Sequence, residues 1–287
     1  MDLDEAASVF TGVRPRLFGI AYRMLGSVSE AEDLVQDVWL RWQGTDRRVV
    51  RNPEAFLATT ATRLAINELQ SARARRETYV GPWLPEPVDT GADPFLGAER
   101  GEALELAVLL VMEKLTPPER AAYVLREAFD YPYPLIADIL QAGEPAVRQL
   151  VSRARKHVAG DRRIPVPEAA QRRLLRTFLE AARTGDLAAL EQLFAADVAS
   201  VSDGNGAPGV ARKVIAGAGR VARFIAAFSD HYWTGVELHP ITANGQAAAV
   251  LRRAGTLLGL VTVAASEDGI ERVLWQMNPE KLATLAR

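Results

Sequence analysis

The stretch between Leu115 and Arg163 constrains the fold more than any other part of the chain, because it predicts three consecutive helices. Thr116-Pro117-Pro118-Glu119 combines a capping threonine, prolines suited to a first turn and the glutamate of a capping box, so a helix should begin there. Asp130-Tyr131-Pro132 should end this helix. Gln141-Ala142-Gly143-Glu144 then separates a short second helix from a third one.

The third predicted helix is amphipathic and basic on its outer side. Its apolar stripe consists of Val147, Leu150, Val151, Ala154 and Val158, and its outer faces carry Arg148, Gln149, Ser152, Arg153, Arg155 and Lys156. A helix-turn-helix with a basic outer face is typical of proteins that read the DNA major groove. The alternative is a trihelical unit without a DNA role, because the stripe alone indicates only a core.

Length and composition indicate a chain of two or three domains. There are 287 residues, of ordinary globular composition, and no cysteine, which excludes disulfides and thiolate chemistry. No leader and no apolar run of membrane-spanning length is visible, so we expect a cytoplasmic protein with no membrane association. The formal net charge is −2, but residues 146–163 hold six Lys and Arg against one acid. Such local basic surfaces in a neutral chain suit DNA contact made together with a larger partner.

The first part of the chain also reads as helical. Apolar residues recur at helical spacing between Phe10 and Trp42, with a break at Gly26-Ser27, and again after Asn52-Pro53-Glu54. In the helix that Ser29 should cap, the polar side chains Asp33, Gln36, Asp37 and Arg41 face outward. By spacing alone these are a solvated face.

These residues carry a resemblance to a known family. The segments Phe18-Gly19-Ile20-Ala21-Tyr22-Arg23-Met24-Leu25-Gly26 and Ala31-Glu32-Asp33-Leu34-Val35-Gln36-Asp37-Val38-Trp39 resemble region 2 of bacterial extracytoplasmic-function sigma factors. Arg63-Leu64-Ala65-Ile66-Asn67 and the arginines after it do so too, and the helix-turn-helix is similar to region 4 of the same proteins. Two blocks in the right order make this resemblance specific.

The resemblance implies partners and roles that spacing does not. The partners would be core RNA polymerase, through the clamp of its largest subunit, and promoter DNA. The residues that contact the polymerase would be Asp33, Gln36, Asp37 and Arg41. Those that contact the −10 element would be Arg63, Asn67, Arg73, Arg75 and Arg76. Those that contact the −35 element would be Arg148, Gln149, Ser152, Arg153 and Lys156. The chain would then be a sigma factor that directs promoter-specific transcription initiation.

The segment between the two blocks reads as a linker, since it is rich in Pro, Gly and acids. It nevertheless contains Trp83-Leu84-Pro85-Glu86-Pro87, and a linker has no compositional reason to expose Trp83 and Leu84. One interpretation is a local hydrophobic contact of these two side chains with either neighbouring domain. The other comes from resemblance: this pentapeptide marks the sigma factors that carry a fused SnoaL-like domain.

The remainder of the chain fits that second reading. Helical patterns come first, and four strands follow, separated by Asn244-Gly245, Ala254-Gly255 and Asp268-Gly269. This order resembles the α+β SnoaL-like (NTF2-like) cone, and Asn278-Pro279-Glu280-Lys281-Leu282 resembles the C-terminal signature of the group. The loop Asp203-Gly204-Asn205-Gly206 departs from the family's pattern at Asn205, and at Ala207 where an arginine is usual.

We therefore expect a multidomain chain with two all-α domains followed by one α+β domain. Its parts are sigma region 2 (1–78), a linker (79–100), the region 4 helix-turn-helix (101–163), a hinge with two prolines (164–167) and a SnoaL-like regulatory domain (168–287). The interdomain contacts are expected at Trp83, Leu84, Asp203, Gly204 and Gly206. The domain would act in cis, without a separate anti-sigma factor.

Enzymatic activity is the alternative function, because some SnoaL-like domains are isomerases or cyclases. Such chemistry needs a buried proton shuttle beside a group that binds the enolate. The candidates are Asp197, Asp203, His231, Tyr232 and His239, and no pair of them stands at a spacing that forces convergence. We therefore expect no catalytic residue, no cofactor and no metal. Whether the cone holds a small ligand stays open.

Overall fold

The computed structural model describes residues 3–91, 104–160 and 163–286, apart from the side chains of residues 3, 73–75, 284 and 286. The chain divides into two compact units. The first comprises Met1–Thr78, Asp93–Leu104 and Val108–Asp161, and the second comprises Tyr79–Ala92, Glu105–Ala107 and Arg162–Arg287. The predicted linker thus begins within the second unit, with the C-terminal domain.

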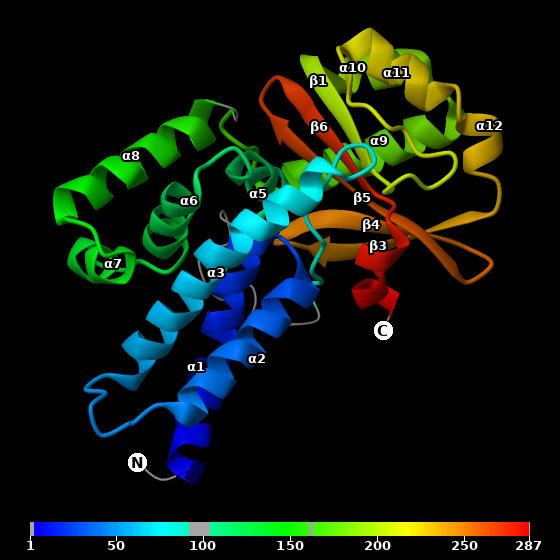
Figure 1. Ribbon diagram of the computed structural model, residues 1–287. Coiled ribbons are helices and arrows are strands. Elements are labelled where there is room, and N and C mark those ends of the chain that lie inside the picture. The colour runs from blue at the N-terminus through cyan, green and yellow to red at the C-terminus, as the bar shows by residue number, and fades with distance from the viewer. Residues whose placement is uncertain (1–2, 92–103, 161–162, 287) are drawn as a thin grey trace. The chain divides into compact units, whose positions relative to one another are not determined.

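The first unit opens with three helices, α1 (Leu3–Leu25), α2 (Val28–Gly44) and α3 (Pro53–Glu77), which pack on one another (Figure 1). Helix α2 begins before the predicted cap Ser29: Ser27 caps it by accepting a hydrogen bond from the backbone N–H of Glu30. Trp42 is fully buried and donates its indole N–H to the carbonyl oxygen of Ala6 at 3.1 Å. The predicted apolar face of α2 is therefore the core of this bundle.

The helix-turn-helix follows as α5 (Leu106–Met112), α6 (Pro117–Tyr123), η2 (Val124–Ala128), α7 (Tyr133–Leu140) and α8 (Glu144–Gly160). The predicted capping box is present: the carboxylate of Glu119 accepts hydrogen bonds from the backbone N–H and the hydroxyl of Thr116. The first predicted helix differs in its last turn, which widens into the π-helix η2 before Asp130 reverses the chain at φ 54°. Of the predicted stripe on α8, Val147, Val151, Ala154 and Val158 are buried.

The second unit is a helix-covered sheet. The helices are α9 (Glu168–Thr184), α10 (Leu187–Leu193), α11 (Ala218–Ala226), α12 (Ser229–Tyr232) and α13 (Pro279–Leu282), with a final 3-10 turn, η3 (Ala283–Ala286). The strands are β1 (Phe194–Asp203), β2 (Ile215–Ala216), β3 (Val236–Ala243), β4 (Gln246–Arg253), β5 (Thr256–Ser266) and β6 (Gly269–Gln276). The order is β2-β1-β6-β5-β4-β3, and among the strand pairs of the described residues only β1–β6 is parallel.

The helices of the second unit enclose its core against the sheet. Helix α9 packs on β4 and β5, and α11 packs on β1 (Figure 1). Phe178 of α9 meets Trp275 of β6 with ring centroids 5.9 Å apart, and Trp233 lies 6.4 Å from the same ring. The parallel register places Ser202 beside Trp275 and Asp203 beside Gln276, so the ends of β1 and β6 lie together. The contacts between the linker and the C-terminal domain are built at these strand ends.

Candidate nucleic-acid interface and linker-binding cluster

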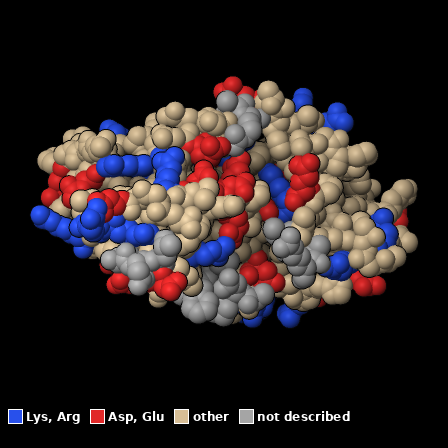
Figure 2. All heavy atoms as spheres, turned by 60° about the horizontal axis from the view of Figure 1, so that its bottom comes forward, with Lys and Arg blue, Asp and Glu red and all other residues tan. Residues whose placement is uncertain are grey.

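The predicted −35 residues all lie on the exposed side of α8. Arg148, Gln149, Ser152, Arg153 and Lys156 are solvent-exposed because the stripe between them is buried. Arg148 also stacks over the Tyr133 ring at 4.3 Å and is paired with Glu144 at 2.5 Å. Figure 2 shows basic and acidic side chains interleaved on this unit. The exposed side of α8 is therefore basic, and Arg153 on it is paired with Glu119 at 2.8 Å.

Two of the predicted −10 residues are engaged within the first unit. The Arg63 guanidinium donates from Nε to the carbonyl oxygen of Ile139 at 2.9 Å and from Nη2 to that of Asp138 at 3.0 Å. These carbonyls lie in the last turn of α7, where helix carbonyls lack intrahelical partners and attract cations. Asn67 is exposed, and the side chains of Arg73 and Arg75 lie outside the described part of the chain.

Arg76, the fifth predicted −10 residue, belongs to a buried charge network. Glu113 pairs with both Arg76 and Arg120, and Arg120 donates from Nε to the carbonyl oxygen of Arg23 at 2.9 Å. Arg120 is fully buried. Burial alone would raise the pKa of Glu113, but the adjacent guanidinium groups of Arg120 and Arg76 hold it below its ordinary value. The network joins α1 and α3 to α6.

The predicted polymerase-facing residues lie on the exposed side of α2. Asp33, Gln36, Asp37 and Arg41 are all solvent-exposed. Asp33 and Asp37 line a depression of about 290 Å³ between α2 and α3, together with the carboxylates of Glu30 and Glu68. This depression gathers negative charge on one surface, which suits a basic partner.

The second unit holds a buried carboxylate to which the linker is bound. Asp203 is fully buried at the end of β1. Its carboxylate accepts hydrogen bonds from the Tyr79 hydroxyl at 2.5 Å, from the Leu84 backbone N–H at 2.8 Å and from the Lys281 ammonium at 2.6 Å. Burial, and then the hydrogen bond to this carboxylate, raise the pKa of Tyr79. One carboxylate thus ties two linker residues to the C-terminal domain.

Lys281 is the second centre of this arrangement. Its ammonium also donates to the carbonyl oxygen of Leu84 at 2.6 Å and lies 4.3 Å from the centre of the Trp83 ring and 4.9 Å from that of Tyr79. Gln276 donates to the carbonyl oxygen of Pro85 at 3.2 Å, and Asn278 donates to the Tyr79 hydroxyl at 2.8 Å. Five side chains make these contacts, one from the linker and four from the C-terminal domain. We call them the linker-binding cluster: Tyr79, Asp203, Gln276, Asn278 and Lys281.

The linker continues along the edge of the sheet. Val88 and Asn244 exchange two hydrogen bonds of 2.9 Å, one from each backbone N–H. The Thr90 backbone N–H donates to the carbonyl oxygen of Thr242 at 2.9 Å. Edge strands present unpaired backbone groups, and the linker pairs some of those of β3.

The loop after Asp203 is shaped for this contact. A Cβ on Gly206, whose φ is 81°, would lie 3.3 Å from the Val80 side chain, and a Cβ on Gly204 would lie 2.8 Å from Val210. Asn205 adopts a φ of 45°, which asparagine tolerates. Trp83, Leu84, Asp203 and Gly206 therefore lie where the linker meets the domain, whereas Gly204 packs against Val210 of the domain itself. Sequence reasoning missed Tyr79, Gln276 and Lys281, although the C-terminal pentapeptide Asn278–Leu282 had signalled the last of these.

The proton-shuttle candidates do not converge. Asp197 is exposed and pairs with Arg163 at 3.2 Å, and His239 is exposed and lies 3.5 Å from Glu237. His231 is exposed at the end of α12. Of the five candidates only Tyr232 lines a pocket between α11, α12 and the sheet. Within the described ranges no cluster of three or more His, Asp or Glu could hold a metal ion, and no helix has the length and hydropathy to cross a membrane.

Comparisons with known proteins show to which family the chain is similar. Residues 9–75 match the family model "Sigma-70 region 2", and residues 105–158 match "Sigma-70, region 4". The chain is 36% identical to the ECF RNA polymerase sigma factor SigJ of Mycobacterium tuberculosis (strain ATCC 25618 / H37Rv), over 96% of this chain and 92% of the relative. It is 29% identical to the probable ECF sigma factor SigI of Mycobacterium tuberculosis (strain CDC 1551 / Oshkosh), over 98% and 96%. The crystal structure of SigJ superimposes with a TM-score of 0.78 at 32% identity, covering 97% of this chain and 98% of that one.

Proposed function

Because the chain belongs to the extracytoplasmic-function sigma factors and directs promoter-specific transcription initiation, we propose which of its residues do this and how its C-terminal domain controls them. The proposal assigns the −35 element to α8, the −10 element to α3, the polymerase to α2 and the control to the linker-binding cluster.

The −35 element is read by the exposed side of α8. A recognition helix contacts base edges through residues near its N-terminal half, and Arg148 and Gln149 stand in the second turn. Ser152, Arg153 and Lys156 continue that side toward the phosphates. A purified Arg148→Ala variant tests this assignment in run-off transcription on native and −35-substituted promoters.

The −10 element is bound by α3, and this requires a change within the first unit. Arg63 uses Nε and Nη2 to donate to the carbonyls of Ile139 and Asp138, and Arg76 is paired with Glu113. The N–H groups in these bonds cannot donate to a phosphate while the bonds last. Binding of Arg63, Asn67, Arg73, Arg75 and Arg76 to DNA therefore follows separation of α3 from α6 and α7. The structure with these bonds in place is then the state of the protein before it binds polymerase.

The polymerase is bound by the acidic side of α2. Asp33, Gln36, Asp37 and Arg41 are exposed and contribute no side chain to the buried core of the bundle. The test is co-purification with core polymerase, where the Asp33→Lys, Asp37→Lys double variant should fail to bind although it is folded.

Control in cis rests on one observation, the buried Asp203 carboxylate that holds Tyr79, Leu84 and Lys281. The linker joins region 2 to region 4, so binding of residues 79–91 to the domain shortens the free connection. Those residues, fully extended, would span up to about 45 Å. The two DNA-binding regions can therefore separate further when the linker is released. An intramolecular contact of this kind is occupied at high effective concentration, so no separate anti-sigma factor is needed.

The experiment that tests control in cis is promoter-specific transcription by core polymerase with the full chain, compared with its Asp203→Ala variant. Asp197→Ala is the matched control, because Asp197 is an exposed carboxylate on the same strand. Output should change in the first variant and not in the second. Equal output from all three proteins at every polymerase concentration refutes the proposal.

The C-terminal domain regulates and does not catalyse. The pocket between α11, α12 and the sheet is lined by uncharged residues, and the carboxylate of Asp203 accepts hydrogen bonds from Tyr79, Leu84 and Lys281. A proton shuttle needs a group free to exchange its proton with the substrate. The protein should act in the cytoplasm, where polymerase and promoter are found.

A further inference from the structure

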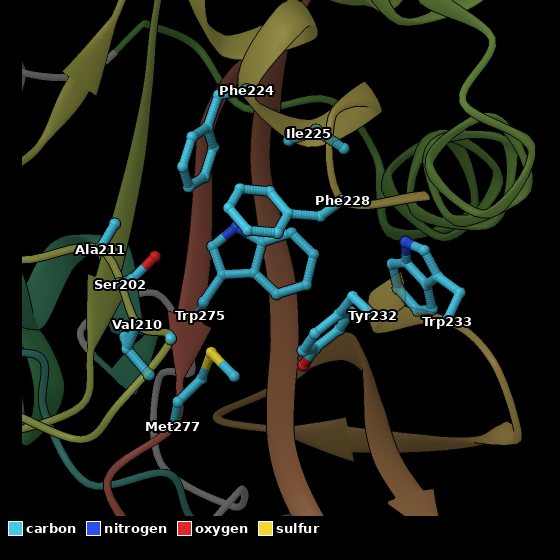
Figure 3. A pocket seen from close by; sticks show the side chains of 11 residues that line it. Ser202, Val210, Ala211, Phe224, Ile225, Phe228, Tyr232, Trp233, Trp275 and Met277 are labelled. Carbon is cyan, nitrogen blue, oxygen red and sulfur yellow. The ribbon is translucent and has the colours of Figure 1, made fainter. Parts of the chain in front are cut away.

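The second unit contains a pocket that the sigma-factor function does not use. It lies between α11, α12 and the ends of β1 and β6 (Figure 3). Its walls are mainly aromatic: Phe224, Phe228, Tyr232, Trp233 and Trp275, with Met277 at the linker end. Every residue that lines it is uncharged. An ionic ligand would find no counter-charge among the lining residues, whereas a flat apolar molecule would find ring faces and edges.

One buried polar group in this wall lacks a partner. The Tyr232 hydroxyl is buried and has no hydrogen-bond partner in the part of the chain that the structure describes. Burial raises the pKa of Tyr232 to about 12, so the hydroxyl is protonated at neutral pH and can donate. Another donor in this wall, the Trp275 indole N–H, already donates to the Ser200 hydroxyl at 3.2 Å. A buried donor without a partner is costly, and a ligand acceptor would satisfy it.

The size of the pocket limits the ligand. Its volume is about 60 Å³. One water needs roughly 10–15 Å³, and an engineered cavity of about 150 Å³ holds benzene. A single ring can therefore enter only if a wall moves outward. Phe228, which is 41% exposed, is the wall on the solvent side, and Met277 and Val210 form the wall toward the linker.

We propose that this pocket binds a small, uncharged, single-ring aromatic molecule with one hydrogen-bond acceptor for Tyr232, and that the bound molecule loosens the linker. The second half of this inference rests on the proposed control in cis.

The geometry connects the pocket to the linker-binding cluster through shared backbone. Side chains alternate along a strand, so Ser202 lines the pocket while its neighbour Asp203 holds the linker. Likewise Met277 lines the pocket, and Gln276 and Asn278 on either side of it hold the linker. The Met277 backbone N–H donates to the carbonyl oxygen of Asp203 at 2.7 Å, which locks the two strand ends together.

A ring larger than the empty volume pushes Met277 and Val210 outward. Val210 is packed against Gly204, and Met277 is bonded to Asp203, so both displacements reach the loop that holds Leu84 and Tyr79. A ligand shifts an equilibrium only by its differential affinity for the two states. When the linker is detached from the C-terminal domain, the walls are free to move, and an oversized ring favours this state. The ligand should therefore release the linker.

The binding half is tested with acetophenone and ethylbenzene, two single-ring molecules that differ in the carbonyl acceptor. The protein has four methionines, so ¹³C-methyl-methionine labelling of the full chain gives a simple spectrum, in which the Met277→Leu variant assigns the pocket signal. Acetophenone should shift the Met277 signal saturably and bind roughly 2- to 12-fold more tightly than ethylbenzene, the range of one hydrogen bond. In the Tyr232→Phe variant this preference should vanish.

A Phe228→Ala variant keeps the test decisive if the wild-type pocket opens too rarely, because removal of the solvent-side wall gives a ring more room. Absence of a saturable shift in both the wild type and this variant overturns the proposal. A preference for acetophenone that survives in Tyr232→Phe overturns the assignment of Tyr232.

The coupling half is tested by hydrogen exchange of the backbone N–H groups of Leu84, Val88 and Thr90, with and without saturating acetophenone. Exchange should accelerate with acetophenone, and the same acceleration in Tyr232→Phe should need a roughly 2- to 12-fold higher concentration. If acetophenone binds but exchange does not accelerate, the coupling is refuted, while Asp203→Ala still decides control in cis. If acetophenone and Asp203→Ala both free the linker but neither alters transcription, the proposed ligand binding by the pocket is supported and the proposed control in cis is refuted.

Discussion

Replacement of Asp203 by alanine should free the linker from the C-terminal domain. The wild-type carboxylate is fully buried and faces an ammonium, Lys281, whose side chain is only 12% exposed. The substitution leaves that ammonium and the Leu84 N–H buried without their acceptor. Loss of one partner of a buried, hydrogen-bonded ion pair costs about 3–5 kcal/mol, because the remaining charge is left uncompensated. Release of the linker relieves this cost, since Lys281 then reaches water.

The assay is hydrogen exchange of the linker amides in the full chain. Each 1.4 kcal/mol corresponds to a factor of ten, so exchange at Leu84, Val88 and Thr90 should accelerate by roughly two to three and a half orders of magnitude, up to the unprotected rate. Amides of β4 and β5 should keep their protection, because the sheet core is not touched. Asp197→Ala should exchange like wild type.

Two results would refute this reasoning. Unchanged exchange of Leu84 in Asp203→Ala would mean that apolar burial of the linker, and not the carboxylate, holds it. Loss of protection throughout β4 and β5 would mean that Asp203 stabilises the whole domain, so that its effect on the linker is not selective.

Three further predictions concern the first unit. Arg148→Ala should lower initiation on the native −35 element roughly 5- to 150-fold, which corresponds to about 1–3 kcal/mol for one contact to a base. The loss should be smaller on a −35-substituted promoter. Equal activity of variant and wild type on the native promoter would argue against contact with the groove. Asp33→Lys with Asp37→Lys should abolish co-purification with core polymerase at unchanged circular dichroism. Arg172→Glu, at an exposed position of α9, should leave co-purification unchanged. Glu113→Gln should lower the free energy of unfolding of the first unit by about 3–5 kcal/mol at neutral pH, since two guanidinium groups lose their carboxylate. The pKa of Glu113 in the folded state lies below its ordinary 4.5, so the stability that this carboxylate contributes is fully present above pH 4.5 and is lost as the pH falls through the folded pKa. The free energy of unfolding of Glu113→Gln, measured with urea, should therefore depend less on pH in that range than that of the wild type. An equal dependence on pH in both proteins would contradict the network.

The sequence by itself determined the elements and their faces. Helical spacing placed Val147, Val151, Ala154 and Val158 inward, and the residues between them were thereby exposed. The capping box at Thr116 and the turns between the last strands also follow from local chemistry, because a cap or a tight turn depends on residues a few positions apart. For the same reason the sequence could indicate that Asp33 and Asp37 share an exposed face.

Only the tertiary structure decided which distant side chains meet. Arg63 was expected to approach DNA, yet in this state it donates to two carbonyls more than seventy residues away. Asp203 and Lys281 are 78 positions apart, and only the β1–β6 pairing and the start of α13 bring them to Tyr79 and Leu84. No periodicity encodes such a meeting, because a pattern fixes the direction of a side chain within its own helix or strand, while a charged partner is set by the packing of whole elements.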